Sequence, residues 1–347
     1  MLLLCTRAYG SSELLLAKYY TTLPTNIHHP ICKACNTCMH NKGKLLSSNP
    51  ETSGNHAQAL ALAARTKGVK AYIVMPTIST PSKIAGTKSY GAEVIFSGST
   101  SQEREAVVEE VQARTGALLV PPYDHPDIML GQGTLALELE EQVHELLRSG
   151  NDLGNSEVKS RKLDAVIAPC GGGGMLSGVA TALSGTGTLV FGAEPSFQGA
   201  DDARRGLAEG KRIESVKTLT IADGLRTPVG KWPWSVISDP TKLKAMYSVS
   251  EREIKAAMRL VLERMKVFIE PSAAVPLAVV LFNEDFRRMV EKEVGDDGWN
   301  VGVVFSGGNT TVEAIGKLFA EDVDAKGERA EGTVGKDGEK VAENVAG

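Results

Sequence analysis

A run of four glycines is the part of the sequence whose residue types point most clearly to chemistry. The apolar segment 166–169 leads through Cys170 into glycines 171–174, after which a helix-like stretch begins. A loop without Cβ atoms can turn several N–H groups toward one point, and the following helix N-terminus adds about half a positive charge there. These features predict a phosphate-binding loop. A tight turn alone needs only one or two glycines, and the spacing fits neither a Walker sequence nor G-x-G-x-x-G.

Two further segments combine short polar side chains with glycine at places where a helix should begin. The first, Thr52-Ser53-Gly54-Asn55-His56, opens an Ala/Leu-rich stretch that stops at Gly68. The second, Phe305-Ser306-Gly307-Gly308-Asn309, follows an apolar strand-like run. Taken alone, each segment can be read as a helix cap, because Ser and Asn are preferred there.

Alternating strand and helix patterns run from about residue 52 to residue 320 and must position these segments. Short β-rich runs lie at 71–75, 93–96, 118–120, 163–168, 189–193 and 301–305, and helix-like stretches at 56–67, 101–114, 134–148, 251–266 and 272–292. This alternation predicts an α/β fold of mostly parallel sheets flanked by helices. Such sheets bind ligands at the carboxyl ends of their strands, where the glycine-rich loop and Ser306 are expected.

Length and charge narrow the class of protein. A chain of 347 residues is long for a single core and favours two lobes. Its net charge of −4 argues against a nucleic-acid partner. No apolar run reaches the roughly 18 residues of a membrane span, and we expect a cytoplasmic protein. We divide the chain into a weakly structured segment 1–51, a smaller lobe 52–150, a larger lobe 151–320 and a disordered tail 321–347.

The order of the motifs resembles that of one enzyme family. S-G-N-H-A-Q from residue 53, P-C-G-G-G-G-M from 169, G-A-E-P from 192, I-A-D-G-L from 221, E-P-S-A-A from 270 and F-S-G-G-N from 305 resemble serine racemases and serine/threonine dehydratases. The resemblance covers about residues 52–318. It implies two α/β lobes with pyridoxal phosphate in the cleft between them, an amino-acid substrate and a homodimer. The family reaction removes the β-hydroxyl of serine or threonine and yields a 2-oxo acid and ammonia.

The resemblance also implies a role for each matching residue. The cofactor phosphate would be held by Gly171, Gly172, Gly173, Gly174 and Met175. Asn55 would bond the phenolic oxygen of the cofactor and Ser306 its pyridine nitrogen, while Ser53, Gly54 and His56 would hold the substrate carboxylate. Ser53 would also be the second acid/base of a racemase, and Glu270 and Asp223 would support the ring.

A cation site is implied in the same way. Glu194, the carbonyl of Ala200, and Asp202 lie where serine racemases hold Mg²⁺ or Ca²⁺ with oxygen ligands. The segment 194–202 is two residues longer than the family form, so a solvated acidic loop stays an alternative.

The lysine on which the family depends has no match. It stands in a segment Ser-Phe-Lys-x-Arg-Gly-Ala about thirty residues before S-G-N, and none of Lys18, Lys33, Lys42 and Lys44 is followed by x-Arg-Gly. Lys33, 22 residues before Asn55, is the nearest in spacing. Residues 1–50 could be a wrongly assigned gene start or a retained intron, the protein could bind its cofactor without a covalent bond, or Lys33 could serve instead. We expect this polypeptide to be weakly active or inactive.

Three of the five cysteines lie in that same stretch and suggest a different function. Cys32, Cys35 and Cys38, followed by His40, have the soft ligands and short spacing that bind Zn²⁺ or an iron–sulfur cluster. Zinc sites usually draw their ligands from two separated pairs. The alternative to an enzyme is therefore a non-catalytic, enzyme-like protein with an N-terminal metal site.

Overall fold

Two sheets form the scaffold of the chain. The computed structural model describes residues 2–8, 19–20, 43–48, 54–148, 162–294 and 299–320. All neighbouring strands of the four-stranded sheet are parallel, in the order β5 (Glu93–Ser97), β4 (Ala71–Pro76), β3 (Leu45–Ser48) and β6 (Leu118–Leu119). The six-stranded sheet has the order β2 (Tyr19–Tyr20), β1 (Leu2–Ala8), β10 (Trp299–Phe305), β7 (Ala165–Pro169), β8 (Leu189–Pro195) and β9 (Ala245–Val249). The strands β10, β7, β8 and β9 pair in parallel. At one edge of the sheet, β1 pairs antiparallel with both β10 and β2.

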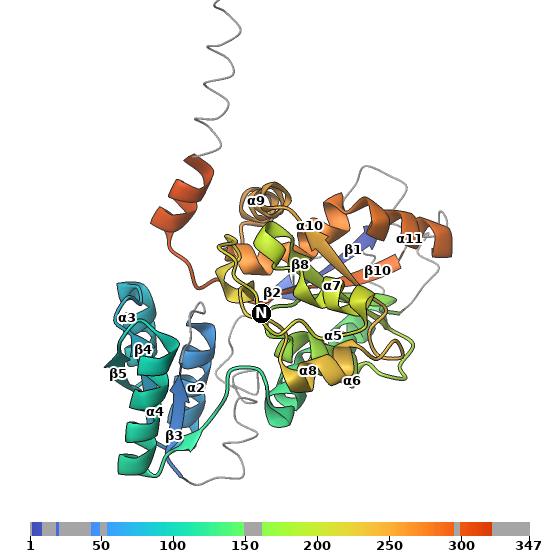
Figure 1. Ribbon diagram of the computed structural model, residues 1–347. Coiled ribbons are helices and arrows are strands. Elements are labelled where there is room, and N and C mark those ends of the chain that lie inside the picture. The colour runs from blue at the N-terminus through green and yellow to red at the C-terminus, as the bar shows by residue number, and fades with distance from the viewer. Residues whose placement is uncertain are drawn as a thin grey trace, which may run out of the picture. The chain divides into compact units, whose positions relative to one another are not determined.

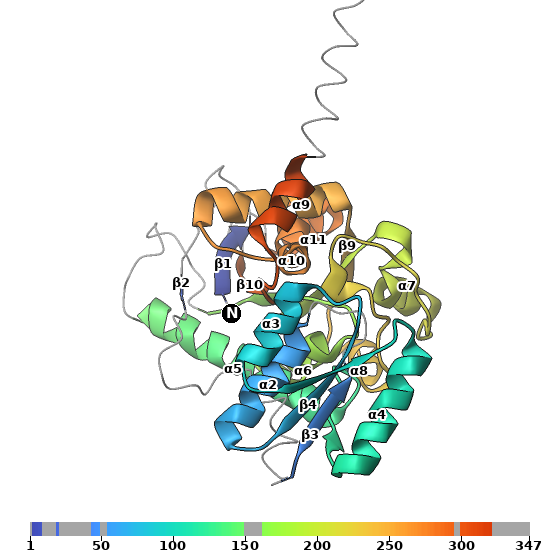
Figure 2. The same ribbon diagram turned by 90° about the vertical axis from the view of Figure 1, so that its left-hand side faces the viewer.

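Helices cover both faces of the four-stranded sheet, as its fully buried central strand β4 requires. On one face, Ile73 and Met75 of β4 pack against Leu60 of α2 (Asn55–Lys67). On the other face, Tyr72 and Val74 pack against α4 (Ser101–Thr115). Figure 2 shows α2 and α4 on either side of β3 and β4, with α3 (Pro81–Ser89) beside α2.

The six-stranded sheet is covered in the same way. One face packs against α5 (Pro126–Arg148), α6 (Gly174–Ala182) and α8 (Lys231–Ile237), which share a core with β7 and β8. On the other face, Phe191 of β8 meets Phe286 edge to face, with ring centroids 5.4 Å apart. The remaining elements are α7 (Asp202–Glu209), α9 (Glu251–Leu260), α10 (Pro271–Phe282), α11 (Glu284–Val294), the short turns η2 (Phe197–Gly199) and η3 (Asp223–Leu225), and the π-turn η4 (Val261–Met265) (Figure 1). The expected α/β architecture with two mostly parallel sheets is confirmed.

Several elements differ from the sequence expectation. The sequence predicts no strand in residues 1–50, whereas β1, β2 and β3 lie there; β2 and β3 have two and four residues, too few to show a period. The expected helix 272–292 is two helices, α10 and α11, because Asn283 interrupts it and its Oδ1 accepts from the Phe286 N–H at 3.0 Å. The expected helix 134–148 begins earlier, at Pro126, and the one at 251–266 ends in the π-turn.

The chain divides into two compact units, Met1–Asn309 and Thr310–Gly347. In the second unit, residues 312–320 are helical. None of the described helices combines the length and apolar character needed to cross a membrane. The tail 321–347, Ser53, Lys33 and the cysteines at 32, 35 and 38 lie outside the described residues.

Candidate active site

The glycine-rich loop joins the buried strand β7 to α6. The helix begins at Gly174, and its N-cap Gly173 has a φ of 83°, a left-handed conformation that favours glycine. In the described turns, loops and caps, no backbone hydrogen bond has an N–H of residues 171–174 as its donor. The loop therefore presents donors at a helix N-terminus, as the sequence predicts for a phosphate site.

Close packing is a second reason for these glycines. A Cβ on Gly172 would lie 2.4 Å from Cγ of Tyr123, and one on Gly171 would lie 2.9 Å from Cα of Leu225. A Cβ on Gly174 would lie 3.0 Å from the carbonyl oxygen of Tyr123. Tyr123 and the turn η3 thus pack against the loop so closely that they leave no space for side chains there. No sequence pattern reveals this constraint.

The second glycine segment opens α2 without a side-chain cap. Its N-cap is Gly54, with a φ of 81°, and no side chain caps the helix. Asn55 instead donates from Nδ2 to Oε1 of Glu270 at 2.8 Å, across 215 residues of sequence. The capping alternative therefore does not describe Asn55, which contacts a different part of the fold.

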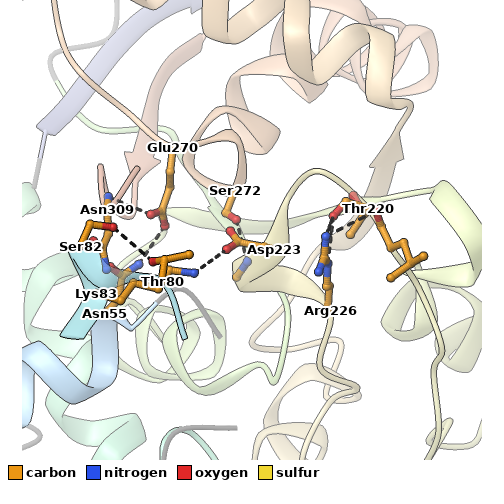
Figure 3. Close-up of polar contacts among 12 residues, drawn as sticks. Asn55, Thr80, Ser82, Lys83, Thr220, Asp223, Arg226, Glu270, Ser272 and Asn309 are labelled. Carbon is orange, nitrogen blue, oxygen red and sulfur yellow. Dashed lines mark hydrogen bonds and ion pairs between the residues drawn. The ribbon is translucent and has the colours of Figure 1, made fainter. Parts of the chain in front are cut away.

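Glu270 brings the second and third glycine segments together. It lies at the N-cap of α10, and its Oε2 accepts from the Asn309 N–H at 2.9 Å. A Cβ on Gly307 would lie 2.9 Å from Glu270 Oε1 and 3.1 Å from Asn55 Nδ2. Ser306, half-buried, directly precedes this contact at the end of β10. Figure 3 shows Asn55 and Asn309 directed at the Glu270 carboxylate.

A second carboxylate, Asp223, completes this polar cluster. Its Oδ2 lies 3.2 Å from Nζ of Lys83, and the next residue, Gly224, donates its N–H to Ser272 Oγ at 3.0 Å (Figure 3). Burial and the Asp223 charge raise the pKa of Glu270, while Asn55, Asn309 and Lys83 oppose that rise. Sequence reasoning missed Lys83, because Thr80-Pro81-Ser82-Lys83 looks like an ordinary helix start.

Hydrogen bonds involving Glu251 and Arg226 hold the segment 220–226, which carries Asp223. Glu251, at the start of α9, accepts from Thr220 Oγ1 at 2.6 Å and from the Ile221 N–H at 2.8 Å. Arg226 donates from Nη2 to the carbonyl of Thr220 at 2.8 Å (Figure 3). This bonding holds η3 against the glycine-rich loop.

His56 is neutral in this setting. Its Nε2 lies 3.3 Å from the carbonyl oxygen of Val120, and because a carbonyl only accepts, Nε2 carries the proton. Burial lowers the pKa of His56 to about 4, and the bond to Val120 opposes this shift. The side chain is therefore not a cation at neutral pH.

Replacing His56 by glutamine should change how stability responds to acid. The unfolded histidine, with an ordinary pKa of 6.5, binds a proton before the folded one, whose pKa is about 4. Its contribution is therefore fully present above pH 6.5 and is lost as the pH falls toward 4. Unfolding free energies measured from pH 7.5 to 4.5 should drop more steeply for the native chain than for His56→Gln. Parallel curves would contradict the assignment.

The residues of the expected cation site lie on β8, after η2 and at the start of α7. Glu194 is buried, and its two oxygens accept from the N–H groups of Ala203 and Arg204, each at 3.0 Å. Oδ2 of the buried Asp202 accepts from the Val229 N–H at 3.0 Å, and Ala200 is also buried. Burial and the Asp202 charge raise the pKa of Glu194, and burial raises that of Asp202 to about 6.

Known proteins resemble this chain over most of its length. A family model described as "Pyridoxal-phosphate dependent enzyme" matches residues 50–307. Serine racemase of Arabidopsis thaliana is 39% identical over 77% of this chain and 74% of its own length. L-threo-3-hydroxyaspartate ammonia-lyase of Saccharomyces cerevisiae is 35% identical over 78% of this chain and 74% of its own. The solved structure of the T.th. threonine deaminase is 37% identical, with a TM-score of 0.66 over 81% of this chain and 83% of that one. The chain therefore belongs to the pyridoxal-phosphate-dependent enzymes, in the group of serine racemases and serine/threonine dehydratases.

Proposed function

We propose that this chain binds pyridoxal phosphate and uses it on L-serine, or on a closely related β-hydroxy amino acid. The observation that carries the proposal is the convergence of separate segments, because Glu270 bonds both Asn55 and Asn309 while η3 packs on the glycine-rich loop. Relatives named as racemases and ammonia-lyases support this substrate class. They do not favour the alternative of a non-catalytic protein with an N-terminal metal site.

The described residues fit the cofactor. Among the described turns, loops and caps, the N–H groups of residues 171–174 donate to no backbone acceptor, and they lie at the N-terminus of α6. We assign the phosphate to Gly171, Gly172, Gly173, Gly174 and Met175. Asn55 has a second amide hydrogen beyond the one given to Glu270, and it suits the phenolic oxygen. Ser306 would face the pyridine nitrogen with a hydroxyl, which donates or accepts.

The amino-acid substrate would be bound at the start of α2. Backbone N–H groups there, beginning at Gly54, attract the substrate carboxylate through the helix dipole. His56, being neutral, would contribute a hydrogen bond or shape rather than charge. Pyridoxal phosphate supplies an electron sink that makes the α-proton of an amino acid acidic. Ser53, outside the described residues, would hold or move that proton on one face.

A divalent cation is the further ligand we propose, at Glu194, Ala200 and Asp202. Glu194 and Asp202 are buried carboxyl groups whose charged forms are disfavoured by burial, and a cation bound to both would offset that cost. Mg²⁺ and Ca²⁺ suit oxygen ligands. Adding either ion should raise the unfolding midpoint of the native chain and leave that of Asp202→Asn unchanged.

We also propose a homodimeric, cytoplasmic protein with the lobes divided near residue 150.

The experiment that tests the function separates turnover from covalent attachment. The chain is loaded with pyridoxal phosphate and offered L-serine, L-threonine or 3-hydroxyaspartate, and ammonia, 2-oxo acid and D-serine are measured. We expect weak turnover or none, because the family's lysine segment has no match. Borohydride reduction and peptide mapping then locate any attached cofactor. Full turnover with an adduct on Lys33 would overturn the expectation and make Lys33 the catalytic lysine.

A further inference from the structure

Lys83 joins parts of the fold that belong to different sheets. It lies in α3, between strands β4 and β5 of the four-stranded sheet, whereas Asp223 begins η3, between β8 and β9 of the six-stranded sheet. Their 3.2 Å ion pair is shielded, with 19% of the Lys83 side chain and 30% of the Asp223 side chain exposed. Figure 3 shows the Lys83 side chain reaching toward Asp223.

The stem of Lys83 also touches the segment that begins α2. A Cβ on Gly54 would lie 3.3 Å from Cγ and 3.4 Å from Cβ of Lys83. One turn further along α3, a Cβ on Gly86 would lie 2.9 Å from the Gln58 amide. The first two turns of α3 therefore pack closely against the start of α2, which couples the position of Lys83 to that of Gly54.

On its other side, the ion pair reaches the glycine-rich loop. Asp223 belongs to η3, which is anchored by Ser272, and the adjacent Leu225 approaches Gly171 closely. Two carboxylates, Asp223 and Glu270, lie near each other there, and the Lys83 ammonium attracts both. Without Lys83, their repulsion would act directly on the contact between Asn55 and Glu270.

We propose that Lys83 is a positioning residue, whose ion pair with Asp223 holds the Gly54–Asn55 segment in place relative to the glycine-rich loop. The substrate carboxylate and the cofactor phosphate would then be bound at a fixed separation. This inference rests on the proposed function for its consequence in binding, but the positioning itself is measurable without cofactor.

The test compares Lys83→Met with Lys83→Arg, with Asp223→Asn and with Lys88→Met. Lys88 is a matched control, because it is an exposed lysine of the same helix, 6.0 Å from the Phe96 ring. The first readout is amide hydrogen exchange at Gln58, whose N–H bonds the Gly54 carbonyl at 3.1 Å, in cofactor-free protein. The second is the dissociation constant of pyridoxal phosphate itself.

We expect Lys83→Met and Asp223→Asn each to speed Gln58 exchange and to weaken pyridoxal phosphate binding about fivefold to tenfold, with no further loss in the double variant. Lys83→Arg, which keeps the charge, should stay within about twofold of the native chain, as should Lys88→Met. Native exchange and native affinity in Lys83→Met would overturn the inference. If the native chain binds no pyridoxal phosphate, the proposed function fails, and Gln58 exchange alone then decides the positioning role.

Discussion

Gly172→Ala is expected to unfold more readily than the native chain and to lose its affinity for pyridoxal phosphate. The new methyl group would lie 2.4 Å from Cγ of Tyr123, where the ring joins the side chain. This atom cannot move aside as the end of a flexible side chain could. Overpacking of this kind costs about 1–3 kcal/mol. The displaced loop would no longer aim its N–H groups at one point. Urea unfolding and equilibrium dialysis of the cofactor measure the two effects.

Two variants separate this steric effect from a general effect of alanine. Gly43→Ala should behave like the native chain, since nothing lies within 4 Å of a Cβ there. Tyr123→Ala removes the obstructing ring, so adding Gly172→Ala to it should cost under about 1 kcal/mol further. Strictly additive losses in the double variant would show that Tyr123 is not what Gly172 avoids.

Glu270→Ala is expected to be the most damaging change to the polar cluster. Glu270 is 2% exposed, and its carboxylate accepts from Asn55 Nδ2 and from the Asn309 N–H. Its removal leaves both donors without their acceptor, which costs about 2–3 kcal/mol in the free energy of unfolding. Asn55 would also lose the bond that orients it, and cofactor affinity should fall as well. Urea unfolding and cofactor dialysis give both numbers.

Glu284→Ala is the matched control for this change. Like Glu270, Glu284 lies at the start of a helix, but its side chain is 75% exposed and forms an ion pair with Arg288. Its loss should change the unfolding free energy by less than about 1 kcal/mol. Equal destabilisation by the two alanine variants would contradict the buried, bridging role assigned to Glu270.

The sequence predicts the fold class because buried parallel strands read as apolar runs. β4, β7 and β10 are such runs, and all three are confirmed. The strand β9 was missed, since Ala245–Val249 includes Ser and Tyr and is only partly buried. The start of α5 was missed because Gly131 and Gly133 weaken the helical pattern. Gly133 is nevertheless needed, since a Cβ there would lie 2.6 Å from the Gly178 carbonyl oxygen of α6.

The local motifs of the site can be predicted from the sequence, but the tertiary contacts between them cannot. The three glycine-bearing segments could be found from the chain alone, because each follows a strand-like run or opens a helix. The meeting of the second and third segments at Glu270 could not be found in this way, since Asn55 and Glu270 are 215 residues apart. The parts played by Lys83 and Tyr123 likewise depend on packing between elements distant in sequence.

Equilibrium dialysis of the cofactor-free chain against pyridoxal phosphate tests the central claim most directly. We predict saturable binding of one pyridoxal phosphate per chain, abolished by Gly172→Ala and unchanged by Gly43→Ala. The absence of saturable binding, or equal binding by Gly172→Ala, would contradict the assignment of the glycine-rich loop as the phosphate site.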